Sequence, residues 1–137
     1  MDVKIAKDKK TILDHYSIRG RVFVIGQGIA WDLEFDDADY EATLFVLYDE
    51  DVPIGAARLW KNKAGRVAVL EEHRHKKAGT RLMEALEAHA AACGYDSVEL
   101  GAQCYIVPFY EKLGYTAYGD VFLDAGIDHR MMRKKLG

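Results

Sequence analysis

Cysteine and proline are scarce in this sequence. Only two of its 137 residues are cysteine, at positions 93 and 104, and only two are proline. Two thiols are too few for a disulfide framework or a zinc knuckle, so both are expected to be reduced. A hydrophobic content of 50% also excludes the disordered and fibrous classes. The composition therefore predicts a single globular domain that covers residues 1–137.

Long apolar runs and an excess of positive charge are missing as well. No apolar run approaches the roughly 20 residues that a membrane-spanning helix needs. The first ten residues lack the apolar core and the small-residue cleavage site of a signal peptide. A formal net charge of −3 argues against a general nucleic-acid binder, which needs a basic face. We therefore expect a cytoplasmic protein without a membrane or nucleic-acid partner.

Metal-binding and thiol-based sites are only weakly indicated. His73 and His75 are two residues apart, a spacing that would put both rings on one face of a strand. No third ligand lies nearby in the sequence, so we expect exposed turn histidines and no bound metal. Cys104 has no neighbouring histidine to activate it, which favours a small buried residue over a nucleophile.

The spacing of apolar residues predicts an α/β fold with a mixed sheet. Strands are expected at residues 2–6, 44–48, 54–60, 66–70 and 97–100, with one or two more between 121 and 135, and helices at 8–23, 79–93 and 106–113. The order is therefore β-α-βββ-α-β-α-β, with an antiparallel meander in the middle and a helical crossover to a strand parallel to 66–70. Helices are expected to pack on this sheet.

Local signals support the three expected helices. Asp8 is an expected N-cap, and Gly94 and Gly114 are expected to end helices. Between the first helix and the meander, the acidic run 32–41 predicts irregular structure, which is usually a solvated loop. The residues expected on the core faces of the helices are Ile12, Leu13, Tyr16, Val22 and Phe23, and Leu82, Met83, Leu86, Ala90 and Cys93.

The most informative stretch covers residues 66–79, RVAVLEEHRHKKAG. A short apolar strand leads into a basic turn, and the turn opens the helix that starts at Gly79. The first amides of a helix have no partner within it, and the helix dipole adds partial positive charge there. This arrangement, with cationic side chains beside it, predicts a binding site for a phosphorylated ligand.

Two motifs give the chain a family resemblance. Residues 74–79, RHKKAG, match the pattern Arg/Gln-x-x-Gly-x-Gly/Ala, and residues 103–115, QCYIVPFYEKLGY, end in Phe-Tyr-Glu-Lys-Leu-Gly-Tyr. Along nearly its whole length the chain resembles the GNAT N-acetyltransferase superfamily. The segments VFVIGQG (22–28), GAARL (55–59) and DAGIDH (124–129) are similar to a small uncharacterised bacterial branch of it.

The resemblance implies acetyl-CoA as cosubstrate and transfer of its acetyl group to an amine. Because the chain has no extra docking domain, we expect the acceptor to be a small molecule. The resemblance implies a strand that pairs with the pantetheine arm, and a turn whose amides hold the pyrophosphate. The residues implied to bind the cofactor are Val67, Ala68 and Val69, Arg74, His75, Lys76, Lys77, Ala78, Gly79 and Thr80, and Gln103 and Phe109.

The sequence departs from the family pattern at three positions. Lys77 stands where the first motif has its central glycine, which permits close backbone approach. Gly65 stands where relatives often carry a glutamate, and Ile106 stands where the second motif has alanine. These departures favour, as an alternative, a GNAT-fold module that binds acyl-CoA without turnover. The absence of Gly-x-x-x-x-Gly-Lys-Ser/Thr argues against a third alternative, a P-loop nucleotide site.

The expected chemistry needs a neutral amine, a stabilised carbonyl oxygen and a proton donor for the thiolate. Tyr110 occupies the position of the family's catalytic tyrosine, and an ordinary phenol is protonated at neutral pH. The oxyanion donor implied is a backbone amide in Val67–Val69. The general base stays open among Glu34, Asp36, Asp37, Tyr105, His129 and a water relay.

The C-terminal tail admits several arrangements. Its apolar residues between Val121 and Met132 fit the edge of a homodimer, a lid over the site or a core strand.

Overall fold

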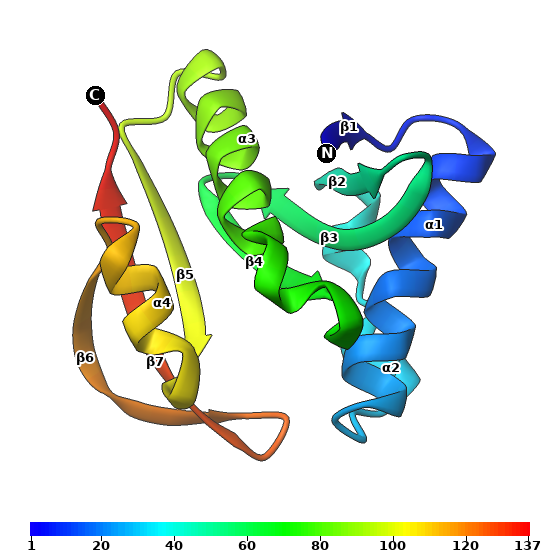
Figure 1. Cartoon of the computed structure of the whole chain (residues 1–137). Helices are drawn as coiled ribbons and strands as arrows, with labels where there is room; N and C mark the ends of the chain where they lie inside the picture. The colour runs from blue at the N-terminus through cyan, green and yellow to red at the C-terminus, as the bar shows by residue number, and fades with distance from the viewer.

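The structure is a computed structural model that describes residues 1–137, and its seven strands form one mixed sheet (Figure 1). The sheet order is β1-β2-β3-β4-β5-β7-β6. The strands are β1 (Asp2–Ile5), β2 (Thr43–Asp49), β3 (Val52–Trp60), β4 (Lys63–Val69), β5 (Ser97–Gln103), β6 (Thr116–Asp124) and β7 (Ile127–Lys135). The helices are α1 (Lys9–Arg19), α2 (Trp31–Glu34), α3 (Ala78–Ala92) and α4 (Val107–Lys112). The predicted mixed α/β class is confirmed.

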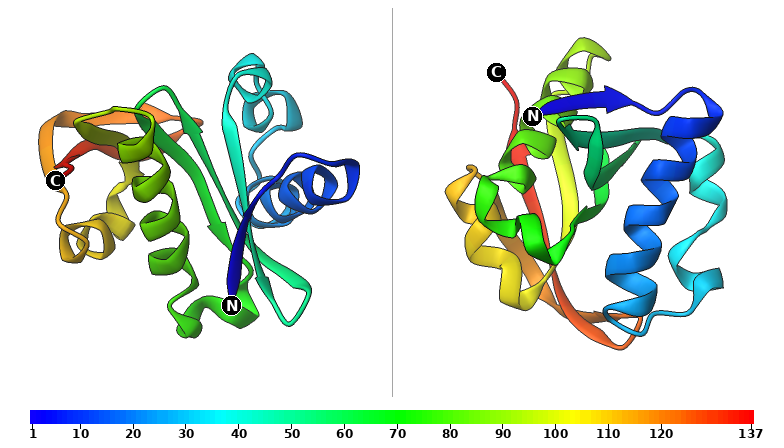
Figure 2. Two further views of the ribbon diagram at one scale, coloured as in Figure 1. Left: turned by 90° about the horizontal axis from the view of Figure 1, so that it is seen from above. Right: turned by 45° about the vertical axis from the view of Figure 1, so that its right-hand side comes forward.

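Helices cover both faces of the sheet. Figure 2 shows α1 and α2 on one side and α3 and α4 on the other. This layering explains why β2 is a continuous apolar run, since residues Leu44–Tyr48 are buried on both faces. No helix is long and apolar enough to cross a membrane.

The first helix begins at the predicted cap and extends further than predicted. The carboxylate of Asp8 accepts a hydrogen bond from the backbone N–H of Thr11 over 2.8 Å. After Arg19 the chain continues for six residues as a π-helix, Gly20–Ile25. Phe23 is buried as expected, but Leu13 is 56% exposed, so its assignment to the core face was wrong. The core position is taken by Ile18 instead.

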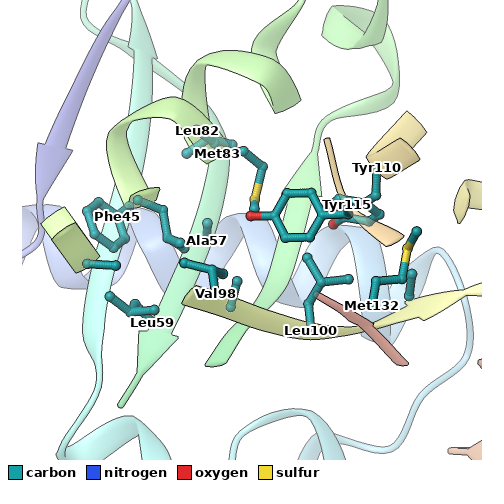
Figure 3. Packing of buried hydrophobic residues seen from close by; sticks show 14 of the residues in the cluster. Phe45, Ala57, Leu59, Leu82, Met83, Val98, Leu100, Tyr110, Tyr115 and Met132 are labelled. Carbon is teal, nitrogen blue, oxygen red and sulfur yellow. The ribbon is translucent and has the colours of Figure 1, made fainter. Parts of the chain in front are cut away.

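Helix α3 packs as its spacing predicts. Leu82, Met83, Leu86 and Ala90 have no exposed surface, and Figure 3 shows two of them in one cluster with residues from β2, β3 and β5. Gly94 ends the helix with a left-handed φ of 90°, which glycine adopts without strain. Cys93 is exposed, so its assignment to the core face was wrong.

Strands β4 and β5 are parallel, but they pair only at the start of β4. Lys63 lies opposite Glu99 and Ala64 opposite Leu100, and no further pairs follow. The predicted parallel orientation of the two strands is confirmed, although residues 66–69 themselves do not pair with β5. The cause is a β-bulge in β4. On β3, Arg58 lies opposite Gly65 and Ala56 lies opposite Ala68, so between these pairs two residues of β4 lie opposite a single residue of β3. A bulge increases local twist, and β4 turns away from β5 beyond it.

The chain ends in a hairpin that is longer than the tail prediction. β6 starts at Thr116 rather than near residue 121, and β7 pairs with both β5 and β6. The β6–β7 turn reaches towards the loop that follows residue 25 (Figures 1 and 2). β7 is thus an internal strand of the sheet and β6 its edge. Gly114 ends α4 as predicted, with a φ of 99°.

Candidate active site

A cavity of about 660 Å³ passes through the sheet where β4 and β5 separate. Side chains that alternate along the strands reach it from both faces, because Val67 and Val69 pack with the α3 cluster while Ala68 and Leu70 pack beneath α1. We call the two parts the α3 side and the α1 side of the cavity. A ligand on one side can therefore meet a ligand on the other within the gap between the strands.

The cavity gathers part of the predicted cofactor set. Val67, Val69, Arg74, Gly79, Gln103, Phe109 and the predicted catalytic Tyr110 line it. Ala68 faces α1 and is buried. The turn residues His75, Lys76 and Lys77 are exposed and, with Ala78 and Thr80, lie outside the lining. They form the turn and the first residues of α3.

Strand β4 presents an unpaired backbone edge to the cavity. The N–H of Leu70 bonds to the carbonyl of Ile54 on β3, so by strand alternation the polar groups of Val67 and Val69 point to the opposite side. That side is not covered by β5 beyond residue 64. Nε of Arg74 donates to the carbonyl oxygen of Val69 over 3.0 Å. The edge can therefore accept a hydrogen-bonding ligand in place of a strand.

The turn before α3 is folded tightly. Residues 71–76 form a 3₁₀ turn, and Lys77 then adopts a left-handed conformation with φ 60° and ψ 28°. This conformation costs a residue with a Cβ roughly 1–2 kcal/mol and costs glycine nothing comparable. Gly79 brings α3 close to α4, since a Cβ there would lie 3.0 Å from Cζ of Phe109.

Tyr110 lies on α4 and packs with the cluster on the α3 side. The side chain is 6% exposed, and its hydroxyl forms no hydrogen bond within the protein. Burial raises the pKa of Tyr110 above that of an ordinary phenol, so the hydroxyl stays protonated at neutral pH. The phenol is therefore a free hydrogen-bond donor at the cavity.

The cavity contains three of the five candidate bases. Glu34, Tyr105 and His129 line the cavity, whereas Asp36 and Asp37 do not. Tyr105 is 72% exposed. Glu34 is only 2% exposed, so this residue departs from the solvated loop that the acidic run predicted, whereas Asp32, Asp36, Asp37 and Glu41 are exposed.

Three carboxylates of the acidic run belong to a closed ring of ion pairs, which we call the arginine–carboxylate ring. Its members, in order, are Arg19, Glu34, Arg66, Asp36, Arg58 and Asp39, with Asp39 returning to Arg19. The nitrogen–oxygen distances around it, in the same order, are 2.9, 3.2, 3.3, 2.6, 3.0 and 2.7 Å. Each carboxylate pairs with two guanidinium groups. Because the ring contains three guanidinium groups and three carboxylates, it has no net charge.

The ring perturbs its members in different ways. Burial alone would raise the pKa of Asp39, but hydrogen bonds and charge from Arg19 and Arg58 outweigh it and lower that pKa. Burial prevails at Glu34 and raises its pKa despite the arginines. The ring joins the short segment 31–40 to α1, β3 and β4, and so holds one wall of the cavity in place.

His15 completes the buried polar cluster on the ring's inner side. Its Nδ1 lies 2.9 Å from the carbonyl oxygen of Phe45, which can only accept, so Nδ1 carries the proton. Nε2 then accepts from Arg19 over 3.1 Å. Burial lowers the pKa of His15 to about 4. Neither His15 nor Arg19 was predicted as a buried polar residue, because both follow helical spacing and look like surface positions.

His129 projects into the α1 side from β7. Its Nδ1 donates to the carbonyl oxygen of Ile127 over 2.7 Å, so in the neutral ring Nε2 is the unprotonated nitrogen. Nε2 forms no hydrogen bond within the protein, and the residue is 8% exposed. The ring of Phe122 stacks on it with centroids 5.7 Å apart. His129 therefore offers a fixed proton acceptor at the cavity.

Gln103 lines the cavity and is hydrogen-bonded to Gln27. Its amide and that of Gln27 exchange hydrogen bonds, from Nε2 of Gln103 over 2.9 Å and from Nε2 of Gln27 over 3.2 Å. The pair joins the end of β5 to the loop after α1. It spans the cavity where the two halves of the sheet separate.

Comparisons with known proteins agree with this geometry. A sequence model of the acetyltransferase (GNAT) domain matches residues 26–136. The chain belongs to the GNAT acetyltransferase family. The uncharacterised N-acetyltransferase YjcF of Bacillus subtilis is 39% identical over 140 residues, 98% of this chain and 99% of that protein.

Comparison with solved structures shows that the fold of this GNAT protein is also similar to that of known acetyltransferases. A protein from Lactobacillus plantarum, named as a proposed N-acetyltransferase, has a TM-score of 0.91 and 28% identity over 98% of this chain and 97% of its own. An aminoglycoside 6′-N-acetyltransferase complexed with coenzyme A has a TM-score of 0.79 and 17% identity over 98% and 97%. The second likeness concerns the fold alone. The predicted superfamily is confirmed.

Proposed function

We propose that this GNAT protein is a cytoplasmic, single-domain enzyme that transfers the acetyl group of acetyl-CoA to an amine of a small molecule. One observation carries the proposal: the cavity through the sheet has a hydrogen-bond donor, Tyr110, on one side and a proton acceptor, His129, on the other. Between them lies the unpaired edge of β4. The two substrates of an acetyl transfer need this arrangement, since each enters from its own side.

The residues on the α3 side fit coenzyme A. Backbone groups of Val67 and Val69 can bond to the amides of the pantetheine arm, as a neighbouring strand would. The residues from Arg74 to Thr80 form the turn before α3 and its first residues, where the free amides of a helix N-terminus favour a pyrophosphate. The close contact between Gly79 and Phe109 keeps a bulky side chain out of this position.

In the proposed transfer, each catalytic group acts on one of the reacting atoms. The thioester supplies the acetyl group, which the amine nitrogen takes as the carbon–sulfur bond breaks. An amide N–H of Val67–Val69 stabilises the carbonyl oxygen as charge develops on it. Tyr110 donates its proton, or a strong hydrogen bond, to the departing sulfur.

His129 is the base that the geometry favours. Nε2 of His129 forms no hydrogen bond within the protein, whereas the carboxylate of Glu34 forms ion pairs with two guanidinium groups. Nε2 takes the proton that the amine releases, directly or through one water. The base thus lies on the same side as the amine, and the acid on the same side as the sulfur.

Thiol release in the presence of an amine panel tests the proposal. We expect amine-dependent release of CoA from acetyl-CoA, with an acetylated amine detected by mass spectrometry. Calorimetry should show acetyl-CoA binding on its own. Binding without any amine-dependent release would contradict the enzyme and favour the non-catalytic acyl-CoA-binding module instead. Absence of binding would contradict both.

A further inference from the structure

We infer from the α1 side of the cavity that the acceptor is a monoamine with an apolar or aromatic substituent, and not a polyamine or another polycation. This inference rests on the proposed function, because it concerns the acceptor of the same site. Its observations are the aromatic wall beside His129 and the arginine–carboxylate ring.

The wall beside the proton acceptor is aromatic. Phe122 stacks on His129 with an angle of 30° between the rings. The same ring lies over β5, where a Cβ on Gly101 would be 3.4 Å from Cζ of Phe122. Ile29 and Leu33 line the α1 side from the segment that follows α1. An amine placed at Nε2 of His129 therefore has apolar side chains around its substituent.

The buried carboxylate of this region cannot serve a second ammonium group. Glu34 is the only carboxylate of the ring that lines the cavity, and both Arg19 and Arg66 hold it. The one other carboxylate in the lining is Asp124, which is exposed at the β6–β7 turn, and the lining also contains the cation Lys63. A second ammonium would lose water without gaining a free buried carboxylate, which is unfavourable.

The space also favours a small acceptor. The cavity of about 660 Å³ has to hold the acetyl end of the cofactor as well as the amine. Ligand pockets of roughly 300–1,000 Å³ each hold one drug-sized molecule, so a shared pocket leaves room for a compact substituent. The Gln27–Gln103 pair further closes the region between the β5 end and the loop after α1.

A matched pair of amines tests the inference. Hexylamine and 1,6-diaminohexane have the same chain and differ in the second ammonium, and phenethylamine adds an aromatic ring. We expect kcat/KM for hexylamine and phenethylamine to exceed that for 1,6-diaminohexane by about tenfold or more, since even one methylene in an apolar pocket changes selectivity by about tenfold. Equal or faster turnover of the diamine would overturn the inference and leave the proposed function standing.

Two variants test whether the preference for an apolar or aromatic amine arises at the aromatic wall. Phe122→Ala should lower kcat/KM for phenethylamine by about tenfold relative to its effect on 1,6-diaminohexane, with unchanged acetyl-CoA affinity. Leu123→Ala is the matched control, because Leu123 is 71% exposed and outside the cavity lining. An equal loss for both amines in the Phe122 variant would overturn the inference.

A further measurement separates this inference from the proposed function. If no amine is acetylated, the proposed function fails, and the preference is judged by calorimetric binding of hexylamine and 1,6-diaminohexane to the protein saturated with CoA. Tighter binding of hexylamine then supports the apolar site. Equal or tighter binding of the diamine overturns it.

Discussion

Arg19 and Glu34 form an ion pair of 2.9 Å between side chains that are 0% and 3% exposed. The pair belongs to the arginine–carboxylate ring, so removing either partner leaves an uncompensated buried charge. Such a loss is far more costly than the loss of a surface pair. The ring therefore anchors the wall that carries Leu33 and Glu34 into the cavity.

Replacing the buried guanidinium should strongly destabilise the protein. We expect Arg19→Met to lower the free energy of unfolding by about 3–5 kcal/mol in urea denaturation, because Glu34 and Asp39 each lose a partner. Arg21→Met is the control, since Arg21 and Glu72 are 54% and 59% exposed and their pair measures 3.5 Å. A surface pair contributes roughly 0–1 kcal/mol. Equal losses in the two variants would contradict the role of the ring.

Stability should fall when the pH is lowered towards the ordinary pKa of histidine and below it. Burial lowers the pKa of His15 to about 4, against 6.5 when it is unperturbed. Between these values the unfolded chain binds a proton that the folded protein does not, so stability decreases as the pH falls. We expect the free energy of unfolding to be about 2 kcal/mol lower at pH 5 than at pH 7 from this group.

A variant isolates this contribution from other titrating groups. In His15→Gln the amide can still donate to Phe45 and accept from Arg19, but it cannot be protonated, so the pH dependence should become smaller. An identical slope for the variant and the wild type would show that His15 is not the group responsible.

Glycine at position 77 should suit the turn better than lysine. Because Lys77 has a left-handed φ of 60°, Lys77→Gly should raise the free energy of unfolding by about 1 kcal/mol and retain or improve acetyl-CoA binding. Lys77→Ala is the control that removes the charge but keeps the strain. Abolished calorimetric binding in the glycine variant, with binding kept in wild type, would refute this account of the turn.

Removing the Tyr110 hydroxyl should affect turnover more than binding. Tyr110→Phe should lower kcat by about a hundredfold or more with little change in acetyl-CoA affinity, because the lost group acts on the departing sulfur. Tyr115→Phe is a control for a core tyrosine, since its hydroxyl donates to Glu87 over 2.7 Å and not to the cavity. Unchanged thiol release in Tyr110→Phe would exclude the role of general acid.

Removing the imidazole of His129 should lower turnover. We expect His129→Gln to lower kcat/KM by about a hundredfold, because glutamine cannot take up the proton that the amine releases. His73→Gln, in the turn before α3 and outside the cavity lining, is the matched control. A variant at position 129 that keeps the wild-type kcat/KM would assign the proton transfer to another group or to water.

Local features of this fold were predictable from the sequence. The apolar face of α3, the Asp8 cap and the glycine ends at 94 and 114 depend on residues within a few positions of each other. The strand, turn and helix around residues 66–79 were also predictable, because each element has its own pattern. Lys77 was recognised as a departure, but its left-handed conformation became visible only in the structure.

The tertiary structure decided how these elements make a site. The bulge opposite β3 separates β4 from β5. The pairing of β5 with β7 brings His129 beside this gap, although His129 lies 60 residues or more from Val67–Val69 in the chain. The arginine–carboxylate ring joins residues from α1, β3 and β4 to the acidic segment, so its burial leaves no local signal. Residue types and spacing thus determined which elements form, while long-range packing and charge pairing determined which side chains are buried and which face the cavity.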